Sequence, residues 1–319
     1  MRRGILIVFG VIMVSIGLGF LLWELNNDEI ATLRGHKGPV RAITICSENG
    51  TLVTTGDDGA VRIWDTSQNR LLKSHPSHSG RSLALAASLR SAVFATGGSD
   101  GTICLWSSKS NEAIASWTAS KQAISCLAFS HDGSMLVSGG TDGLIRLWNT
   151  ENQKIIREWK CAAKNVSCLS FALDAKNIVV SAGEHDSIRV WDGSNGRQIS
   201  AITLHKKNVR SLGFSADGKQ LWAAVSGIGV MSWNWPDCSE GPTIAGSGMA
   251  WSLTFRGDGS RMATSHEDGT VKLWAMPEGR LLKNFRGHKG VAIAVAFSPD
   301  GKSIASIGSE GSVKRWPAK

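Results

Sequence analysis

The stretch Asp57-Asp58-Gly59-Ala60-Val61-Arg62-Ile63-Trp64-Asp65 decides the fold of this chain, because versions of it recur at a nearly constant interval. Each version consists of a turn and a short alternating segment that ends in tryptophan. A repeat of 41 to 43 residues corresponds to one four-stranded propeller blade. The pattern therefore predicts an all-β fold, a seven-bladed β-propeller of four-stranded antiparallel blades. The seven tryptophans are Trp64, Trp106, Trp148, Trp191, Trp233, Trp274 and Trp316.

Within each repeat, the strand signals come in one order. In the first repeat they predict strands over residues 40–45, 51–55, 61–64 and 70–73, with a hairpin turn at 47–50. Later repeats place Asp-Gly at this hairpin, and these residues suit it because they tolerate positive φ. The Asp-Gly pairs are Asp132-Gly133, Asp217-Gly218, Asp258-Gly259 and Asp300-Gly301.

The two ends of the repeat region are complementary. The last repeat stops at Trp316 without an outer strand, while a spare strand signal lies at residues 29–34. We expect that strand to complete the seventh blade beside residues 313–316, which would cover both sheet edges.

An uncharged apolar run, Gly4 to Trp23, precedes the repeats. As a helix, its twenty residues would span about 30 Å, the thickness of the hydrocarbon core of a bilayer. The sequence thus predicts a cytoplasmic tip and transmembrane anchor helix over residues 1–24, a linker over 25–28 and the propeller over 29–319. The alternative is a cleaved signal peptide, for which Gly17-Leu-Gly19 is a weak cleavage match.

Flanking charges predict the orientation of this single-pass anchor. Arg2 and Arg3 precede the helix and acidic residues follow it, which favours a cytoplasmic amino terminus and a propeller outside the cytoplasm, periplasmic if the source is bacterial. The alternative, a cytoplasmic propeller, is favoured by Arg34 and by the free cysteines. Because the linker is short and the first strand runs toward the Gly35-His36 loop, we expect that loop to face away from the membrane.

Composition weighs against several other classes of protein. The net charge is +9, but the Lys and Arg residues are dispersed and are not interleaved with aromatic residues, so we expect no nucleic-acid partner. The six cysteines form no Cys-x-x-Cys pair, and none has a histidine at metal-ligand spacing. We expect free core cysteines, as at Cys104, Cys126 and Cys168, and neither metal nor cofactor.

From about residue 29 to residue 317, the chain resembles the WD-repeat β-propeller family. The Trp-Asp pair stands at Trp64-Asp65 and Trp191-Asp192, and the Gly-His pair at Gly35-His36 and Gly287-His288. The resemblance implies that blades are braced by hydrogen-bonded sets of His, Ser or Thr, an acid and Trp. Three repeats contain complete sets, which are His36, Thr54, Asp58 and Trp64; His78, Thr96, Asp100 and Trp106; and His288, Ser306, Glu310 and Trp316.

These sets remove the obvious Ser-His-Asp candidates from catalysis. Glu184-His185-Asp186 occupies an inter-strand turn, where such residues are ordinary. Other repeats depart from the set, and we expect these repeats to be either less rigid or released for binding. The departures are Ser120 for His in the third repeat, His185 for Asp in the fourth, Ala223 and Gly227 in the fifth, and Gly246 for His in the sixth.

The resemblance implies a non-catalytic interaction scaffold, or an accessory subunit of a membrane-associated complex. We call the face formed by the loops that carry Gly35-His36 and their equivalents the His-loop face, and we expect a protein partner there. The alternative is a small-ligand sensor or an enzyme that uses the central channel. Trp251, with Met249 and Met231, is either an aromatic anchor for the partner or a tryptophan packed between blades. The candidate cationic contacts are Lys37, Arg41, Arg81 and Lys289, with Lys206, Lys207 and Arg210 as a second group.

Overall fold

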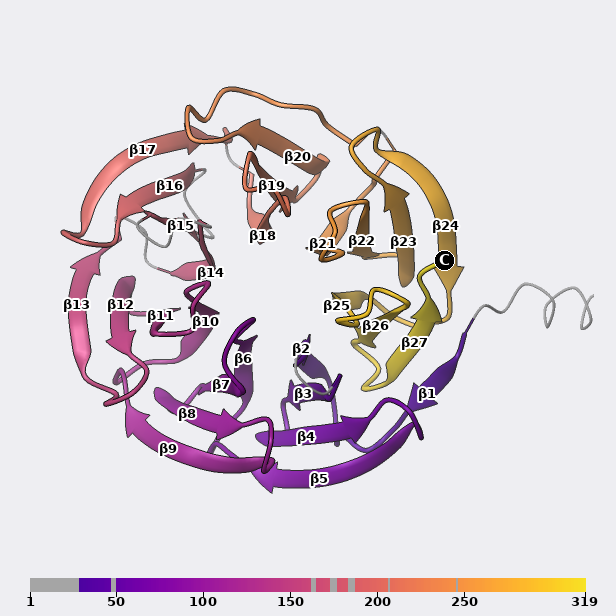
Figure 1. Cartoon of the computed structure of the whole chain (residues 1–319), viewed down its shortest axis with the longest axis horizontal. Helices are drawn as coiled ribbons and strands as arrows, with labels where there is room; N and C mark the ends of the chain where they lie inside the picture. The colour runs from indigo at the N-terminus through magenta and orange to yellow at the C-terminus, as the bar shows by residue number, and fades with distance from the viewer. Residues whose placement is uncertain are drawn as a thin grey trace, which may run out of the picture.

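Seven antiparallel sheets are arranged as a ring (Figure 1). The inner strands of all seven line a central cavity, which we call the channel. The computed structural model describes residues 29–46, 50–161, 165–172, 177–182, 187–205, 207–244 and 246–319. Within those residues, no helix has the length and apolar character to cross a membrane. The predicted anchor, Gly4 to Trp23, lies outside the described residues.

We number the sheets by the repeat that supplies their inner strands. In sheets 1 to 6 the strands run in chain order from the channel outward, whereas in sheet 7 the first strand of the chain lies outside the last. Sheets 1 to 3 contain β2 (Val40–Ile45), β3 (Leu52–Gly56), β4 (Ala60–Asp65) and β5 (Arg70–Pro76); β6 (Ser82–Ala87), β7 (Val93–Gly98), β8 (Thr102–Ser107) and β9 (Glu112–Thr118); and β10 (Ile124–Phe129), β11 (Met135–Gly140), β12 (Leu144–Asn149) and β13 (Ile155–Lys160). Sheets 4 to 6 contain β14 (Val166–Phe171), β15 (Asn177–Ala182), β16 (Ser187–Asp192) and β17 (Arg197–Thr203); β18 (Val209–Phe214), β19 (Gln220–Val225) and β20 (Gly229–Asn234); and β21 (Ala250–Phe255), β22 (Arg261–His266), β23 (Thr270–Ala275) and β24 (Arg280–Arg286). Sheet 7 contains β25 (Ala292–Phe297), β26 (Ser303–Gly308), β27 (Val313–Pro317) and β1 (Ala31–Leu33).

Sheet 5 corrects the prediction of seven four-stranded blades, because it has three strands while the other six have four. The chain after β20 forms two isolated bridges to it, Val230 with Ile244 and Trp233 with Glu240. Between those bridges lies Pro242, whose nitrogen has no hydrogen to donate to a ladder. The ladder is therefore interrupted where the fourth strand was expected.

The predicted closure of the ring is confirmed. β1 pairs antiparallel with β27, with Ala31 opposite Arg315 and Leu33 opposite Val313. Lys314 Nζ also lies 2.5 Å from Glu29 Oε2. The first and last strands of the described chain thus share sheet 7, and β1 covers the edge that β27 would otherwise expose.

The core lies between neighbouring sheets rather than inside any one of them. Five of the six residues of β4 are buried, because both faces of a middle strand contact an adjacent sheet. Trp64 packs in a cluster that includes Leu33 of sheet 7, whereas Val53 packs against Trp106 of sheet 2. The predicted hairpin glycines adopt positive φ, between 65° and 75°, at Gly133, Gly218, Gly259 and Gly301.

Candidate functional site

The three predicted hydrogen-bonded sets are confirmed. In sheet 1, Thr54 Oγ1 accepts a hydrogen bond from Trp64 Nε1 at 2.9 Å and lies 2.9 Å from His36 Nε2. His36 Nδ1 lies 2.9 Å from Asp58 Oδ1. The corresponding contacts join the sets of sheet 2 and sheet 7. These histidines and hydroxyls are therefore used inside the blades.

Burial sets the protonation of these histidines. It lowers the pKa of His36, His78 and His288, so each imidazole is neutral near pH 7. In sheet 7 a neutral ring meets both neighbours when Nδ1 donates to Glu310 and Nε2 accepts from Ser306, each at 2.7 Å. An imidazole held in this way braces the sheet and has no nitrogen left for general-base chemistry.

Sheet 3 builds a shorter set around a serine. Ser120 takes the histidine position and its hydroxyl donates to Asp142 Oδ2 at 2.7 Å. Trp148 Nε1 donates to Ser138 Oγ at 2.9 Å. Ser120 therefore still connects the loop to the carboxylate of Asp142. Among the described residues of this set, no hydrogen bond connects Ser120 to Ser138 or to Trp148.

Sheet 6 forms a related set in which glycine and histidine have exchanged positions between the loop and the second strand. In sheet 1, Gly56 leaves room for the loop histidine, because a Cβ there would lie 2.9 Å from His36 Nδ1. The equivalent positions in sheet 6 hold His266 and Gly246, the other way round. His266 Nε2 lies 2.7 Å from Thr264 Oγ1, the oxygen that also accepts the N–H of the sheet's tryptophan. An imidazole on the strand thus replaces one on the loop.

A β-bulge occurs at the same place in all seven inner strands. The pairing register skips one residue at the start of each, and that residue is released from the ladder. Five of the seven line a cavity of about 380 Å³ at the mouth of the channel. The bulged residues are Arg41, Leu83, Ser125, Ser167, Arg210, Trp251 and Ile293.

Arg41 is paired within its own sheet. Its Nε and one terminal nitrogen donate to the two carboxylate oxygens of Asp57, each at 2.6 Å. The bond from Arg41 lowers the pKa of Asp57 more than burial raises it, and Arg81 adds a further lowering through its charge. The predicted cation at position 41 is therefore neutralised by a neighbour.

Arg210 and Trp251 are in contact, which the sequence did not predict. The guanidinium carbon of Arg210 lies 3.9 Å from the centroid of the Trp251 ring, within cation–π range. Trp251 is half-buried and lines the cavity at the mouth. Met249 is 50% exposed nearby in the chain, whereas Met231 packs against the core between sheets 4 and 5, so the prediction that groups Met231 with Trp251 is wrong.

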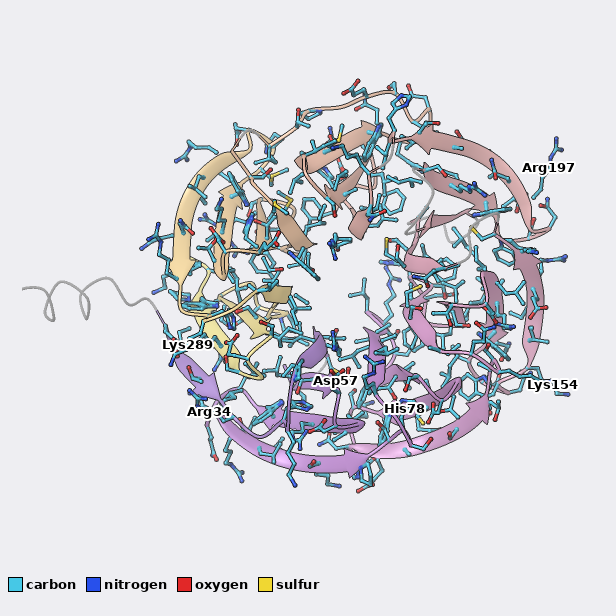
Figure 2. All side chains as sticks on the ribbon, turned by 180° about the vertical axis from the view of Figure 1, so that it is seen from behind. Arg34, Asp57, His78, Lys154, Arg197 and Lys289 are labelled. Atoms are coloured by element: carbon cyan, nitrogen blue, oxygen red, sulfur yellow. The ribbon has the colours of Figure 1, made fainter. Side chains whose placement is uncertain are left out.

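The remaining candidate cations lie on loops. Lys37, Arg81 and Lys289 are exposed residues of the connections between an outer strand and the next inner strand, and Lys207 is half-buried in such a connection. Lys206 lies outside the described residues, as do Glu184, His185 and Asp186. Figure 2 shows Asp57 toward the channel, while Lys154 and Arg197 lie at the outer edge of the ring.

In the described part of the chain, no group of three or more His, Cys, Asp or Glu residues could hold a metal ion. Five of the six cysteines are buried, among them Cys104, Cys126 and Cys168, as predicted for core residues. Burial raises the pKa of the Cys46 thiol to about 12, which makes it unreactive near neutral pH.

Comparison with protein families gives a match to the repeats. The model of the WD domain, G-beta repeat, matches residues 27–65, 69–107, 111–149, 153–192, 241–275 and 279–317, more than half of the chain. The unmatched stretch between residues 192 and 241 contains β17 of sheet 4 and all three strands of sheet 5. Sheet 5 therefore departs from the family pattern in sequence as well as in strand number.

Proposed function

We propose, from the premise that this chain belongs to the WD domain, G-beta repeat family, that it is a non-catalytic scaffold for protein–protein interaction. The partner docks on the His-loop face, at the mouth of the channel. A propeller that displays loops from every repeat on one rigid face suits this role, because loops carry recognition while the sheets fix their positions.

The ring of bulged residues carries the proposal. Because each of the seven side chains is released from its ladder, its identity can vary without disturbing a sheet. Two of them are arginines and one is a tryptophan, residue types enriched at the energetic centres of protein interfaces. The exposed Lys37, Arg81 and Lys289 lie on loops of the same face and would steer an acidic partner surface toward it.

The proposal includes a membrane anchor over Gly4 to Trp23, with the propeller outside the cytoplasm. The direction of β1 supports the predicted placement of the faces. The chain runs from Ala31 at the start of β1 to the loop with His36 beyond its end. Glu29 and Ile30 therefore approach β1 from the end opposite to the His-loop face, and an anchor placed on that side would leave the His-loop face free for a partner.

A tagged purification of the full chain from gently solubilised membranes tests the proposal, with co-purifying chains identified by mass spectrometry. We expect a stoichiometric partner that is lost when Lys37, Arg81 and Lys289 are changed to Glu. Arg41 is left unchanged in this variant because a glutamate there would face Asp57.

The matched control carries Lys154→Glu and Arg197→Glu at the outer edge of the ring, and it should retain the partner. Loss of the partner in both variants would point to general electrostatics and would contradict the assignment of the face. A chain that purifies without any protein partner would overturn the scaffold proposal and favour a small ligand bound at the channel.

A further inference from the structure

Sheets 1 and 5 place an arginine at the same position of the repeat. Arg41 and Arg210 each stand 23 residues before the closing tryptophan of the repeat, Trp64 and Trp233. Both are the bulged residue of their inner strand, and both line the cavity at the mouth. Any difference between them therefore comes from their surroundings and not from their place in the fold.

The two arginines meet different partners. The residue seven positions before the closing tryptophan is Asp57 in sheet 1 and Ser226 in sheet 5. Asp57 accepts two hydrogen bonds from Arg41, each at 2.6 Å, whereas Ser226 Oγ accepts one from Arg210 Nε, at 3.0 Å. A neutral hydroxyl leaves the charge of Arg210 uncompensated, and among the described residues no carboxylate forms an ion pair or a hydrogen bond with it.

Arg210 is nevertheless held in position. Trp251 supports one face of the guanidinium at 3.9 Å, and the bond to Ser226 fixes its Nε edge. Arg210 is exposed, so its terminal N–H groups are accessible from solvent. A planar guanidinium held in one orientation loses little entropy when a carboxylate binds to it, which favours a paired contact with a carboxylate.

Two exposed apolar residues lie close in sequence to Ser226 and Trp251, the residues that hold this cation. Ile228 and Met249 are 46% and 50% exposed, and each lies two residues along the chain from Ser226 or Trp251. The other exposed large hydrophobic residues of the described chain lie on outer strands, at the amino-terminal start or in the hairpin turn at Leu89. Exposed apolar residues on the segments that hold an uncompensated arginine favour a polypeptide over a free anion as the ligand.

We propose that this part of the mouth, over sheets 5 and 6, binds an Asp or Glu side chain of the protein partner. The carboxylate of the partner completes at Arg210 the ion pair that Asp57 supplies to Arg41 in sheet 1. This inference rests on the scaffold function and names the chemistry that its partner must present.

Two fluorescein-labelled libraries of random decapeptides test it, identical except for a fixed central Glu in one and Gln in the other. Fluorescence anisotropy with the full chain should show about tenfold tighter binding of the Glu library, the size expected for a charge-assisted contact. Ser226→Asp should abolish this preference, because the new carboxylate occupies Arg210 as Asp57 occupies Arg41. Arg210→Gln should abolish it as well, and it keeps the test decisive if the first variant folds poorly.

Thr141→Asp is the matched control. Thr141 is the equivalent of Ser226 in sheet 3, where the bulged residue is Ser125, so this variant adds the same charge without an arginine to pair with. It should keep the preference for Glu. The inference is overturned if the wild-type chain shows no preference, if Ser226→Asp retains it, or if sodium glutarate binds as tightly as the Glu library. The tagged purification does not depend on this preference, so the scaffold proposal can survive such a result.

Discussion

The hydroxyl of Thr54 joins the histidine and the tryptophan of the bracing set in sheet 1. Thr54→Val therefore tests what that set contributes to the stability of the fold. Valine has nearly the same shape, so the change removes the hydroxyl with little change in packing. Thr54 is fully buried, and both Trp64 Nε1 and His36 Nε2 would lose their partner at Oγ1. Each buried polar group left without a partner costs about 1–3 kcal/mol, so we expect the free energy of unfolding to fall by about 2–6 kcal/mol.

The next residue supplies a control with the same substitution. Thr55 is also fully buried, but its Oγ1 has no hydrogen-bond partner. Thr55→Val should therefore leave the free energy of unfolding unchanged or raise it by about 1 kcal/mol, since an unpaired hydroxyl is removed. Urea denaturation of the full chain followed by circular dichroism measures both variants. Equal effects of the two changes would refute the argument that the bracing set, rather than burial alone, stabilises the sheet.

Three further outcomes are expected. Burial lowers the pKa of His266 to about 4, so as the pH falls below about 6.5 the unfolded chain binds a proton before the folded chain does, and stability is lost. His266 should therefore lower the free energy of unfolding by about 2 kcal/mol between pH 7 and pH 5. Denaturation of His266→Gln at both pH values should show a decrease that is smaller by this amount. Gly59→Ala and Gly246→Ala both place a side chain at φ near 70°, which costs about 1–2 kcal/mol. At Gly59 the Cβ would also meet the carbonyl oxygens of His78 and Gly80, so the melting temperature should fall clearly further for Gly59→Ala than for Gly246→Ala. An equal fall in both variants would contradict the close contact between sheets 1 and 2. Removal of residues 1–33 should lower the melting temperature and promote association through the exposed edge of β27, whereas removal of residues 1–28 should do neither, as light scattering and calorimetry would show.

The repeat spacing was sufficient to predict the ring, the bracing sets of sheets 1, 2 and 7, and the closure by β1. These features depend on residues at fixed offsets from the tryptophans, and such offsets can be read directly from a sequence. The fourth strand of sheet 5 was predicted wrongly because the period continues through a segment whose proline interrupts the ladder. A period specifies the length of a repeat but not the hydrogen bonds of each strand.

The site was harder to predict because its decisive contacts join residues of different repeats. Arg210 and Trp251 belong to neighbouring sheets, and the ring geometry that brings them together has no linear signal. The sequence pattern did not predict the role of His266, because the histidine of a bracing set is expected at the loop position, where Gly246 stands. The paired exchange, glycine for histidine and histidine for glycine, was the signal that could have found it.

The pairing of β1 with β27 has a consequence for the time course of synthesis. Ala31 leaves the ribosome long before Arg315 does, yet they are opposite residues in one sheet. At about 5–20 residues per second, the first strand waits on the order of 15 to 60 s for its partner. During that interval the ring cannot close, however well the earlier sheets have formed. A nascent chain arrested shortly before Val313 should therefore display an open ring, a state that chaperones would encounter on every polypeptide made.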